Sequence, residues 1–471
     1  MHLVNNTHTR SAVDHALLIS KNYPQNSPRY TSYPTAHEFS EKIKNKDFET
    51  CLSESNNALI PDNLSLYLHL PFCRFLCFYC GCNRIVTKNR DKGKKYLDYL
   101  EREIALVGHH IDTDRKVDQL HLGGGTPTFY DIGQLDRILT TLGQHFAMDL
   151  SDDREFSIEI DPRTVDEKTI HGLFALGFNR LSMGVQDFDP KVQEAIHRIQ
   201  TKESVGALTR AARDTGFASI NYDLVYGLPH QTVQSFSNTI QKVVDFGPDR
   251  ISIFQYAHLP GMFPAQRRIQ DEWLPDNQRR MDLLQSARDM LESAGYIHIG
   301  LDHFSRPEDP LALAHASGNL TRNFQGYSAS EHHETVGMGV SAISDVGGGI
   351  FQNAKTLEDY YAALDKHEIP VARGVIRHVD DEIRRQVITE IMCNGRIDKL
   401  QFQSIAGVSF NNYFSHESKT LSQLESDGAI SQTEFELSVT DCGQHLLRTI
   451  ARTFDVYRRS PSRHQELSAS N

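Results

Sequence analysis

The sequence contains no run of about twenty consecutive apolar residues, and its opening stretch, MHLVNNTHTRSAVDH, lacks an apolar signal core. Cysteine is scarce and odd in number, with seven in 471 residues. An odd number of cysteines in a long chain without a secretory signal argues against a disulfide framework. We therefore expect a soluble protein of the cytoplasm, a reducing compartment, with no membrane insertion.

Positive charge is in deficit as well. Lysine and arginine number 49 against 61 aspartate and glutamate residues, which gives a formal net charge of −12. This balance argues against a general nucleic-acid-binding surface, so no nucleic-acid partner is expected. An anionic substrate must therefore meet a local basic patch.

Two segments offer such a patch. Arg29, Tyr30 and Tyr33 in PRYTSYPTA form an aromatic, basic stretch that we interpret as a lid over a site, with Arg29 as a candidate for binding substrate carboxylates. The run NRIVTKNRDKGKKY, which follows Cys82, is rich in arginine and lysine. Most of its charges also fit the solvated start of a helix.

Against this background the chain has four cysteines within ten residues, Cys73, Cys77, Cys80 and Cys82, in HLPFCRFLCFYCGCN. The first three have the spacing C-x3-C-x2-C. Three thiolates on one loop can bind three irons of a [4Fe-4S] cluster and leave the fourth iron open to a small chelating molecule. A structural zinc completed by Cys82 or His69 is the alternative, and the loop alone leaves both open.

Short apolar or alternating runs recur between longer stretches that have apolar residues at helical spacing. The predicted strands are Leu64–Leu70, Gln119–Leu122, Phe156–Ile160, Arg180–Val185, Ser219–Tyr226 and Arg250–Tyr256. The predicted helices are Lys94–Val107, Ile132–His145, Glu167–Leu176, Val205–Thr215 and Val233–Phe246. Strands that alternate with helices predict a parallel sheet.

Six such units, with a further strand expected at His298–Leu301, predict an α/β fold of a specific kind. We expect a partly closed (β/α)6-type TIM-like barrel over residues 61–356. Residues 1–60 are expected to form an N-terminal extension and lid segment.

After about Thr356 the pattern becomes helical, with helices predicted at Asp381–Cys393 and Tyr413–Asp427 and then a short β-turn-β and a helix. These elements predict a small C-terminal helical or winged-helix-like domain over residues 357–459. The polar tail 460–471 is predicted to be disordered.

The glycines of GGGTPT, residues 123–128, follow the second predicted strand. Without Cβ atoms they let the backbone lie directly against a ligand, and Thr126 adds a hydroxyl group. The simpler interpretation is a tight turn closed by Pro127. Because carboxyl ends of parallel strands meet on one face, motifs at strand ends are expected to share a site.

Glu159 and Asp161 flank Ile160 in SIEIDPR at the end of the third predicted strand. Alternation places both carboxylates on the same side of that strand. If they face the barrel interior, they need a bound cation or ammonium group, or an ion pair with Arg163 or Arg180.

Gln186, Arg198 and Asp223 are isolated polar residues in or near apolar segments. Such residues more often lie on the surface or have partners in the core than contact a ligand. Asp223, inside NYDLVYGLP, is the most suggestive, because an acid there can accept a hydrogen bond from a ribose hydroxyl.

The cysteine loop followed by GGGTPT resembles the radical S-adenosylmethionine (SAM) superfamily. With PRYTSYPTA, SIEIDPR, NRLSMGVQDF, YDLVYGLP and RNFQGY, the chain resembles the oxygen-independent coproporphyrinogen III oxidases from about Arg29 to Tyr457. GCN after the third cysteine, PRYTSYPTA and RNFQGY are the discriminating motifs, because a related heme-chaperone family shares the barrel and the cysteines.

This resemblance implies that Cys73, Cys77 and Cys80 are the metal ligands of a [4Fe-4S] cluster and that Cys82 is a neighbour of it. A SAM molecule bound to the cluster would contact Tyr67, Gly124, Glu159 and Ile343, with Tyr67 and Glu159 at the catalytic centre. Glu159 would hold the ammonium group of the methionine. A second SAM molecule is implied at Tyr79, Gly125, Thr126, Gln186, Arg198, Asp223 and Ala257, with Gln325 joining the same site.

The implied activity is oxidative decarboxylation of two propionate side chains of coproporphyrinogen III to vinyl groups, which gives protoporphyrinogen IX in heme biosynthesis without oxygen. A 5'-deoxyadenosyl radical generated at the cluster would remove hydrogen from the propionate. The implied partners are a flavodoxin- or ferredoxin-like reductant and an electron acceptor, and a monomer is expected. A heme chaperone without decarboxylase activity is the alternative.

Overall fold

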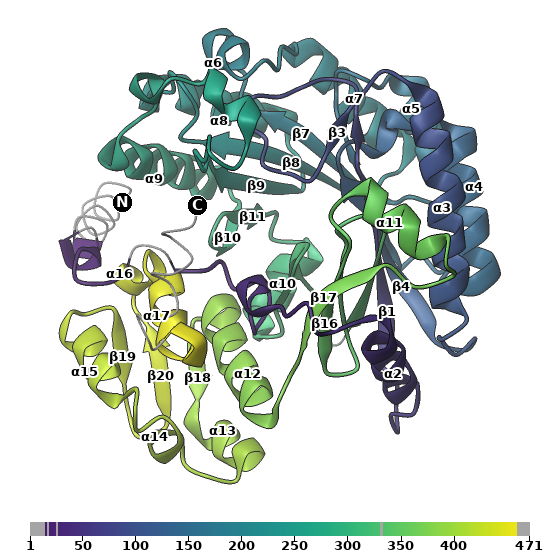
Figure 1. Cartoon of the computed structure of the whole chain (residues 1–471). Coiled ribbons are helices and arrows are strands. Elements are labelled where there is room, and N and C mark those ends of the chain that lie inside the picture. The colour runs from purple at the N-terminus through teal and green to yellow at the C-terminus, as the bar shows by residue number, and fades with distance from the viewer. Residues whose placement is uncertain (1–14, 17, 25–26, 330–332, 459–471) are drawn as a thin grey trace.

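The computed structural model describes residues 15–16, 18–24, 27–329 and 333–458. The tail 460–471, for which disorder is predicted, lies outside the described residues. The six predicted strands are all present and confirm the α/β fold, since they lie side by side in chain order and run parallel (Figure 1). They are β1 (Asn63–Leu70), β4 (Lys116–Gly124), β6 (Glu155–Ile160), β7 (Arg180–Gln186), β8 (Ser219–Tyr226) and β9 (Arg250–Gln255).

Helices follow the strands and cover the outer face of the sheet (Figure 1). Their starts are fixed by side chains that accept hydrogen bonds from free backbone amides, as Asp131 does from Gln134 and Thr232 does from Ser235. The helices are α3 (Arg90–Gly108), α4 (Ile132–His145), α5 (Glu167–Ala175), α6 (Pro190–Ala195), α7 (Lys202–Thr215), α8 (Val233–Phe246) and α9 (Asn277–Ser293).

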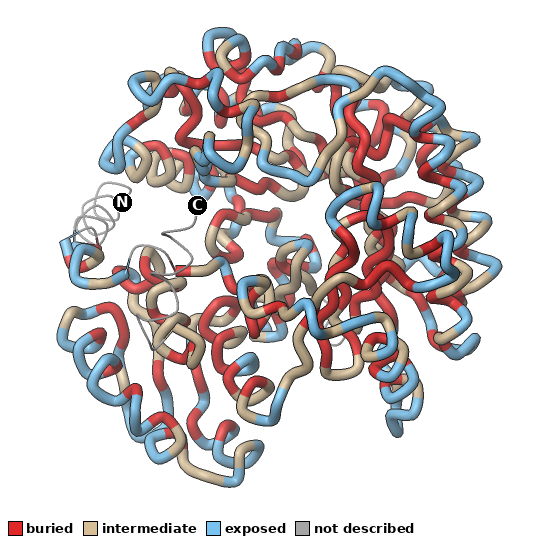
Figure 2. The backbone as a smooth tube through the Cα atoms, in the orientation of Figure 1, coloured by how far each residue is buried: buried red, intermediate tan, exposed pale blue. Residues whose placement is uncertain are grey.

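Apolar and polar residues alternate along the strands. The apolar side chains pack in the core, and the polar ones point to the inner face of the sheet. In β6, Phe156, Ile158 and Ile160 are buried in the main apolar cluster, which also contains buried helix residues such as Ile138. The tube in Figure 2 accordingly is buried along the strands and exposed on the outer sides of the helices. The intervening polar residues of the strands face the opposite way, toward a cavity.

The predicted strand at His298–Leu301 is present as β10 (Ile297–Gly300), but it does not extend the parallel sheet. It forms an antiparallel hairpin with β11 (His303–Ser305), which pairs with β9. Only Leu301 and Asp302 join the two strands, whereas a parallel connection needs about a dozen residues or more.

The strand β14 (His333–Met338), which pairs with β1 in parallel, was not predicted. Beyond it the sheet continues antiparallel through β15 (Ile343–Val346), β16 (Gly349–Asn353) and β17 (Val371–Ile376). Among the described residues the ladder runs from β10 to β17 and these two ends do not pair. Closure of the predicted barrel is therefore not observed, and the sheet stays open.

The predicted boundary at 356/357 differs from the observed packing. Helix α11 (Leu357–Leu364) packs beside α3, and β17 pairs with β16, so the large sheet extends to Ile376. The sequence analysis did not predict β17, because this strand is short and lies between two helices in the chain.

The smaller C-terminal unit begins with α12 and has its own apolar cluster. Its strands form a three-stranded antiparallel sheet in the order β18-β20-β19. Its elements are α12 (Val379–Asn394), β18 (Arg396–Asp398), α13 (Lys399–Ala406), α14 (Phe410–Tyr413), α15 (Ser418–Ser426), β19 (Ile430–Gln432), β20 (Glu436–Val439), α16 (Asp441–Gln444) and α17 (Leu447–Thr453). The predicted helix Tyr413–Asp427 begins later than expected, because residues 414–417 form a turn between α14 and α15.

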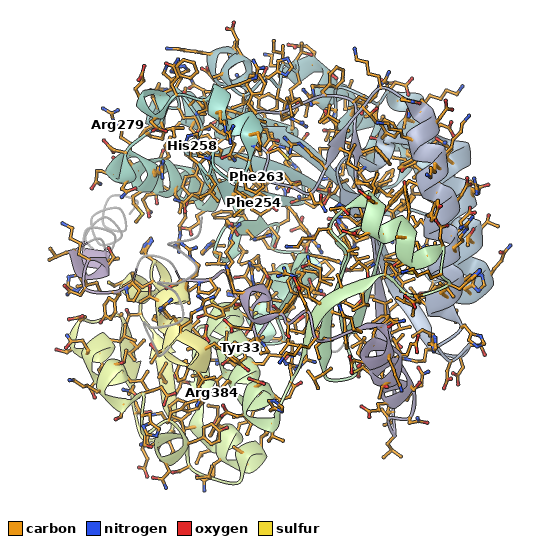
Figure 3. The ribbon with its side chains drawn as sticks, in the orientation of Figure 1. Tyr33, Phe254, His258, Phe263, Arg279 and Arg384 are labelled. Atoms are coloured by element: carbon orange, nitrogen blue, oxygen red, sulfur yellow. The ribbon has the colours of Figure 1, made fainter. Side chains whose placement is uncertain are left out.

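The N-terminal segment joins the two units. Tyr30 and Tyr33 are buried in the apolar cluster of the C-terminal unit, and Tyr33 lies close to it in Figure 3. The Tyr30 hydroxyl donates to Asp455 over 2.9 Å. Helix α2 (Asn45–Asn56) instead packs against the large sheet, with the rings of Phe48 and Phe351 5.0 Å apart.

The remaining elements are short. They are β2 (Phe72–Cys73), β3 (Ile85–Val86), β5 (Ala147–Met148), α10 (Pro310–Ser317), β12 (Thr321–Asn323), β13 (Gly326–Ser328) and the 3-10 helices η1 (Ala36–Glu38), η2 (Pro127–Phe129), η3 (Pro264–Arg268), η4 (Asp271–Trp273) and η5 (Val456–Arg458). Among the described residues, no helix combines the length and the apolar character needed to span a bilayer.

Candidate functional site

A cavity of about 710 Å³ lies on the inner face of the parallel strands. Alternate residues of β4, β6, β7, β8 and β9 line it, together with the cysteine loop after β1 and the hairpin of β12 and β13. This volume is in the range of sites for large organic ligands, about 300–1,000 Å³.

Cys73, Cys77 and Cys80 all line this cavity. The loop that carries them is fixed at its base by β2, which pairs with β3, and by the amide of Phe78, which donates to the carbonyl oxygen of Ile196. The structure therefore brings the three predicted ligands to one wall, directly after β1.

Each of the three sulfurs faces a hydrogen-bond donor. Thr126 Oγ1 donates to the Sγ of Cys73 over 3.4 Å, and Arg163 Nη2 donates to the Sγ of Cys77 over 3.2 Å. The amide of Cys82 donates to the Sγ of Cys80 over 3.5 Å. Donors of this kind favour thiolate, the form that binds metal.

The thiols differ in proton affinity. A hydrogen bond from the Cys82 thiol, helped by the charge of Arg84, lowers the pKa of Cys80. Burial raises the pKa of Cys73 to about 11, and the hydrogen bond from Thr126 opposes that rise. Metal binding would displace the proton of Cys73.

Within the described residues, no three His, Cys, Asp or Glu side chains converge on the position of one metal ion. A structural zinc needs four ligands around a single ion. The cysteines of a [4Fe-4S] cluster each bind a different iron and need not converge. Three thiol groups on one cavity wall, each with a hydrogen-bond donor at its sulfur, are a donor set that suits a [4Fe-4S] cluster.

The predicted glycine motif ends β4 beside the cysteine loop. The Gly125 amide donates to the carbonyl oxygen of Leu70, and a Cβ on Gly125 would lie 2.5 Å from the carbonyl oxygen of Pro71. Gly124 has a φ of 108°, which favours glycine. Only glycine lets these two strand ends approach so closely, so the motif both packs the loop and exposes backbone to the cavity.

Glu159 and Asp161 both line the cavity, as the alternation predicts, but they have different partners. His121 Nε2 donates to Glu159 over 3.1 Å, and the Gly124 amide donates to its other oxygen over 3.3 Å. The Glu159 side chain remains 40% exposed. It is held in place and can still accept a hydrogen bond from a ligand.

The sequence analysis considered an ion pair with an arginine for both Glu159 and Asp161. Asp161 forms such a pair. Arg163 lies 2.6 Å from it and Arg198 lies 3.3 Å from it. Although burial raises the pKa of Asp161, the charges of Arg198 and Arg163 outweigh burial and lower it. The other arginine considered, Arg180, pairs with Glu155 at 2.5 Å.

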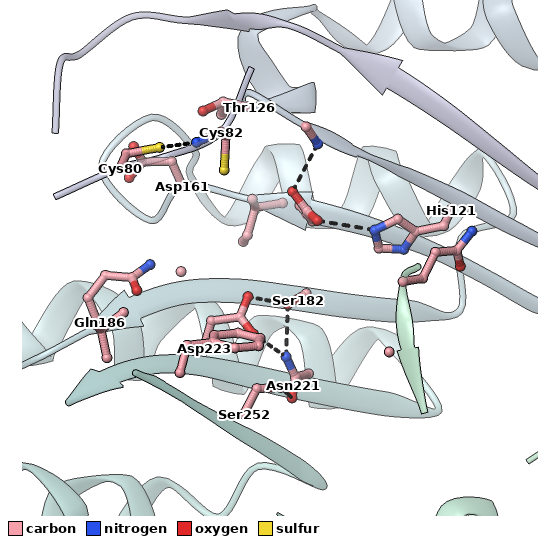
Figure 4. A pocket seen from close by; sticks show the side chains of 18 of the residues that line it. Cys80, Cys82, His121, Thr126, Asp161, Ser182, Gln186, Asn221, Asp223 and Ser252 are labelled. Atoms are coloured by element: carbon pink, nitrogen blue, oxygen red, sulfur yellow. Dashed lines mark hydrogen bonds and ion pairs between the residues drawn. The ribbon is translucent and has the colours of Figure 1, made fainter. Parts of the chain in front are cut away.

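The isolated polar residues Gln186, Arg198 and Asp223 meet in the same cavity. Asp223 accepts hydrogen bonds of 2.9 Å from Ser182 Oγ and from Asn221 Nδ2. Figure 4 shows Ser182, Asn221, Asp223 and Gln186 across the cavity from Cys80. Burial raises the pKa of Asp223.

Tyr79 and Ala257 come from loops far apart in sequence and are joined by a residue that the sequence analysis missed. Gln266 Nε2 donates to the carbonyl oxygen of Tyr79 over 3.0 Å and to that of Ala257 over 3.1 Å. Gln325 lines the cavity from the turn between β12 and β13.

Tyr67 and Ile343 are not among the residues that line the cavity. Tyr67 stacks on His121, with ring centroids 5.8 Å apart, and its hydroxyl is 3.0 Å from His69 Nδ1. Ile343 lies at the start of β15.

The basic residues considered for binding an anionic substrate lie in different places in the structure. Arg29 lines the cavity and pairs with Asp302. In the run after Cys82, Arg84 lines the cavity, but Arg90 packs over Phe129, 4.6 Å from the ring centroid. The aromatic part of the predicted lid, Tyr30 and Tyr33, is buried in the C-terminal cluster.

Sequence reasoning missed a set of polar residues that line the inner face of the strands. A signal was present: in QLHLGG, FSIEI, RLSMGVQ and SINYDLVY polar residues occupy alternate positions. That pattern marks a strand with one apolar and one polar face. The missed residues are Gln119, His121, Glu155, Ser157, Ser182, Asn221, Arg250 and Ser252.

Comparison with known proteins gives a consistent result. The sequence profile of the Radical SAM superfamily matches residues 67–243. The chain is 46% identical to the oxygen-independent coproporphyrinogen III oxidase of Salmonella typhimurium, with 97% of this chain and 98% of the relative covered. The protein of the same name from Escherichia coli strain K12 is 44% identical, with 97% and 98% covered.

A solved structure agrees with these relatives. Coproporphyrinogen III oxidase (HemN) from Escherichia coli, described as a radical SAM enzyme, superposes with a TM-score of 0.87 at 45% sequence identity. The match covers 91% of this chain and 97% of that one.

Proposed function

Because this chain belongs to the family of oxygen-independent coproporphyrinogen III oxidases, which are radical SAM enzymes, we propose that it converts two propionate side chains of coproporphyrinogen III to vinyl groups without oxygen. The product would be protoporphyrinogen IX, an intermediate of heme biosynthesis.

One observation carries this proposal: the three spaced cysteines share a cavity with the polar strand-end residues expected to bind SAM. A cysteine loop with a purely structural role does not require Glu159, Gln186 and Asp223 to face it across a cavity. The combination supports a site for a cluster and an organic ligand together.

Cys73, Cys77 and Cys80 would hold the [4Fe-4S] cluster. When bound, the cluster and SAM supply one-electron cleavage that yields methionine and a 5'-deoxyadenosyl radical. Glu159, held by His121 and the Gly124 amide, would bind the methionine ammonium group. Tyr67 and Ile343 would contact the same SAM molecule, with Tyr67 at the catalytic centre beside Glu159.

A second SAM molecule would bind in the same cavity. The residues proposed to contact this molecule all line the cavity. They offer polar side chains or backbone groups that can bind ribose, carboxylate or adenine. They are Tyr79, Gly125, Thr126, Gln186, Arg198, Asp223, Ala257 and Gln325.

The residues of the chain place the propionate and exclude water from it. Loss of a hydrogen atom from the β-carbon of the propionate, followed by loss of carbon dioxide, leaves one electron that passes to an acceptor. A flavodoxin- or ferredoxin-like protein would supply the reducing electron. We propose that the protein acts as a cytoplasmic monomer.

The test is an anaerobic incubation of the iron-reconstituted protein with coproporphyrinogen III, SAM and a one-electron reductant. The proposal predicts protoporphyrinogen IX together with methionine and 5'-deoxyadenosine, and none of these from a Cys77→Ser variant. Absence of protoporphyrinogen IX, combined with stoichiometric binding of added heme, would instead identify a heme chaperone.

A further inference from the structure

Residues 256–270, which we call the β9 segment, follow strand β9, include η3 and fold back on themselves. The amide of Phe263 donates to the carbonyl oxygen of Leu259 over 2.9 Å, and Arg267 Nε donates to the carbonyl oxygen of Pro260 over 3.1 Å. These bonds close the segment on itself, so it can act as one piece of the cavity wall.

Two contacts join the β9 segment to the cysteine loop. Gln266 Nε2 donates over 3.0 Å to the carbonyl oxygen of Tyr79, which lies between the second and third predicted cluster ligands. The ring of Phe263, labelled in Figure 3, packs against Gly81, where a Cβ would lie 3.2 Å from it. The position of the β9 segment is therefore tied to that of the cysteine loop.

The side-chain amide of Gln266 is the polar part of this junction. Gln266 is 1% exposed, and its Nε2 also donates to the carbonyl oxygen of Ala257 over 3.1 Å. Its Oε1 accepts from the Leu259 amide over 2.6 Å. Two partners can only accept and the third can only donate, so they fix the orientation of the amide group.

The two carbonyl oxygens depend on this one nitrogen atom. Among the described residues, no second donor reaches the carbonyl oxygen of Tyr79 or that of Ala257. Because an unpaired polar group inside a protein is costly, both oxygens stay within reach of Gln266 Nε2. Gln266 therefore sets the spacing between the two backbone segments, and all three residues line the cavity.

The cysteine loop has anchors of its own. The Phe78 amide donates to the carbonyl oxygen of Ile196 over 2.9 Å, and Arg84 Nη2 donates to that of Cys77 over 3.1 Å. Neither bond involves the β9 segment. Loss of the Gln266 amide should therefore leave the cysteines in place and release the backbone at Ala257.

We infer that Gln266 is a positioning residue for the second SAM molecule, because it holds the backbone of Tyr79 and of Ala257, two of the proposed contacts, at a fixed spacing. The inference rests on the proposed function and adds the residue that shapes this site. A ligand binds more tightly to contacts that are already held in place, since less conformational freedom is lost on binding.

The SAM molecule at the cluster should not depend on Gln266. Its expected contacts include Glu159 and Gly124, on β6 and β4. Glu159 is held by His121 at 3.1 Å and by the Gly124 amide at 3.3 Å. The two SAM sites thus have separate supports, which lets one be weakened without the other.

The test measures binding of SAM to the reconstituted full-length protein by equilibrium dialysis. Wild type should bind two molecules. In Gln266→Met and in Gln266→Glu the Kd of one molecule should rise about tenfold or more, because each variant loses both donated hydrogen bonds. Gln266→Glu keeps the acceptor for the Leu259 amide, so a rise in both variants assigns the effect to the two donors.

A second measurement identifies which molecule is weakened. SAM that binds the open iron changes the electron paramagnetic resonance spectrum of the reduced cluster. The SAM concentration at the midpoint of that change should be the same in wild type and in both Gln266 variants, and their iron contents should agree. A merely structural role would lower stability without raising a single Kd.

Asn179→Leu is the matched control. The side-chain amide of Asn179 also joins two backbone segments: it accepts from the Phe156 amide over 2.9 Å and donates to the carbonyl oxygen of Arg154 over 2.6 Å. Asn179, Phe156 and Arg154 all lie outside the set of described residues that line the cavity. This variant should bind both SAM molecules with wild-type affinity.

Wild-type affinity for both SAM molecules in Gln266→Met and Gln266→Glu, with circular dichroism spectra of folded protein, would overturn the inference. So would an equal loss in Asn179→Leu, or a wild type that binds a single SAM molecule. The proposed activity fails separately: Gln266-dependent binding of a second SAM molecule without anaerobic formation of protoporphyrinogen IX would reject the activity and retain the role of Gln266.

Discussion

Arg198 donates a hydrogen bond from Nη1 to the Sγ of Cys77 across 3.4 Å, while its Nη2 donates to the carbonyl oxygen of Gly184 across 2.6 Å. The same guanidinium group also faces the buried Asp161. One side chain therefore connects the cysteine loop with β7 and with the end of β6.

Replacing Arg198 should destabilise the fold as well as the site. Arg198→Met leaves Asp161 with Arg163 as its remaining cation, so we expect the free energy of unfolding to fall by about 2 kcal/mol in urea denaturation. Arg137→Met is the control, because Arg137 pairs with Asp98 and Glu101 at the surface, and it should cost less than about 1 kcal/mol. Equal losses in the two variants would contradict this reading of Arg198.

The cysteines should divide into ligands and a neighbour. Cys73→Ser, Cys77→Ser and Cys80→Ser should each lose the iron chromophore and the activity after anaerobic reconstitution, measured by absorbance and iron content. Cys82→Ser is the matched control and should retain a chromophore. A Cys82→Ser protein that loses its iron while Cys80→Ser keeps it would reverse the assignment.

Glu159 should determine the affinity for SAM. Glu159→Gln removes the negative charge while keeping the shape, so the Kd for SAM should rise about tenfold or more in calorimetric titration of the reconstituted protein. His121→Gln keeps the carboxylate but removes the imidazole that orients it, and a smaller increase is expected. Unchanged affinity in Glu159→Gln would show that the ammonium group binds elsewhere.

Two glycines offer a matched pair of substitutions. A Cβ on Gly184 would lie 2.7 Å from Gln186 Nε2 and 2.8 Å from Arg198 Nη2, whereas a Cβ on Gly143 meets nothing within 4 Å. Gly184→Ala should therefore lower the free energy of unfolding by about 1–3 kcal/mol. Gly143→Ala, in α4, should raise it by up to about 1 kcal/mol. Thermal unfolding that ranks the two variants in the opposite order would refute the packing argument.

The buried carboxyl group of Glu103 should make stability depend on pH. Burial raises its pKa from 4.5 to about 7, although hydrogen bonds from Tyr360, the Gly339 amide and Asn353 oppose the rise. Between pH 4.5 and 7 the folded state keeps a proton that the unfolded chain releases, so the free energy of unfolding falls as pH rises.

The change over this window should be at most about 3 kcal/mol. Glu103→Gln cannot titrate, so its free energy of unfolding relative to wild type should improve steadily from pH 4.5 to pH 7 in urea denaturation. Parallel curves for the two proteins would exclude titration of Glu103 in this range.

The six strands from β1 to β9 that were predicted could be recognised because their apolar residues repeat with the period of a strand between helices of ordinary length. Residues 219–226 have the same bounds in sequence and structure. The antiparallel strands β15, β16 and β17 were not predicted. They are four to six residues long, and their pairing depends on neighbours that local pattern does not reveal.

In the site, the position of the motifs at strand ends predicted that the cysteines, Glu159 and Asp223 lie together, and all of them line one cavity. Their partners were not predictable, because His121 and Gln266 meet them only after strands and loops distant in sequence come together.

The anchoring of Tyr30 by Asp455 sets an order of events during synthesis. These residues are 425 positions apart, so the hydrogen bond between them can form only after almost the entire described chain has left the ribosome. Until then the segment carrying Arg29 lacks the anchor at Tyr30, while β1 through β9 and the cysteine loop are already available to fold. The nascent chain therefore passes through a stage in which the cysteine loop exists before Tyr30 is fixed to the C-terminal unit.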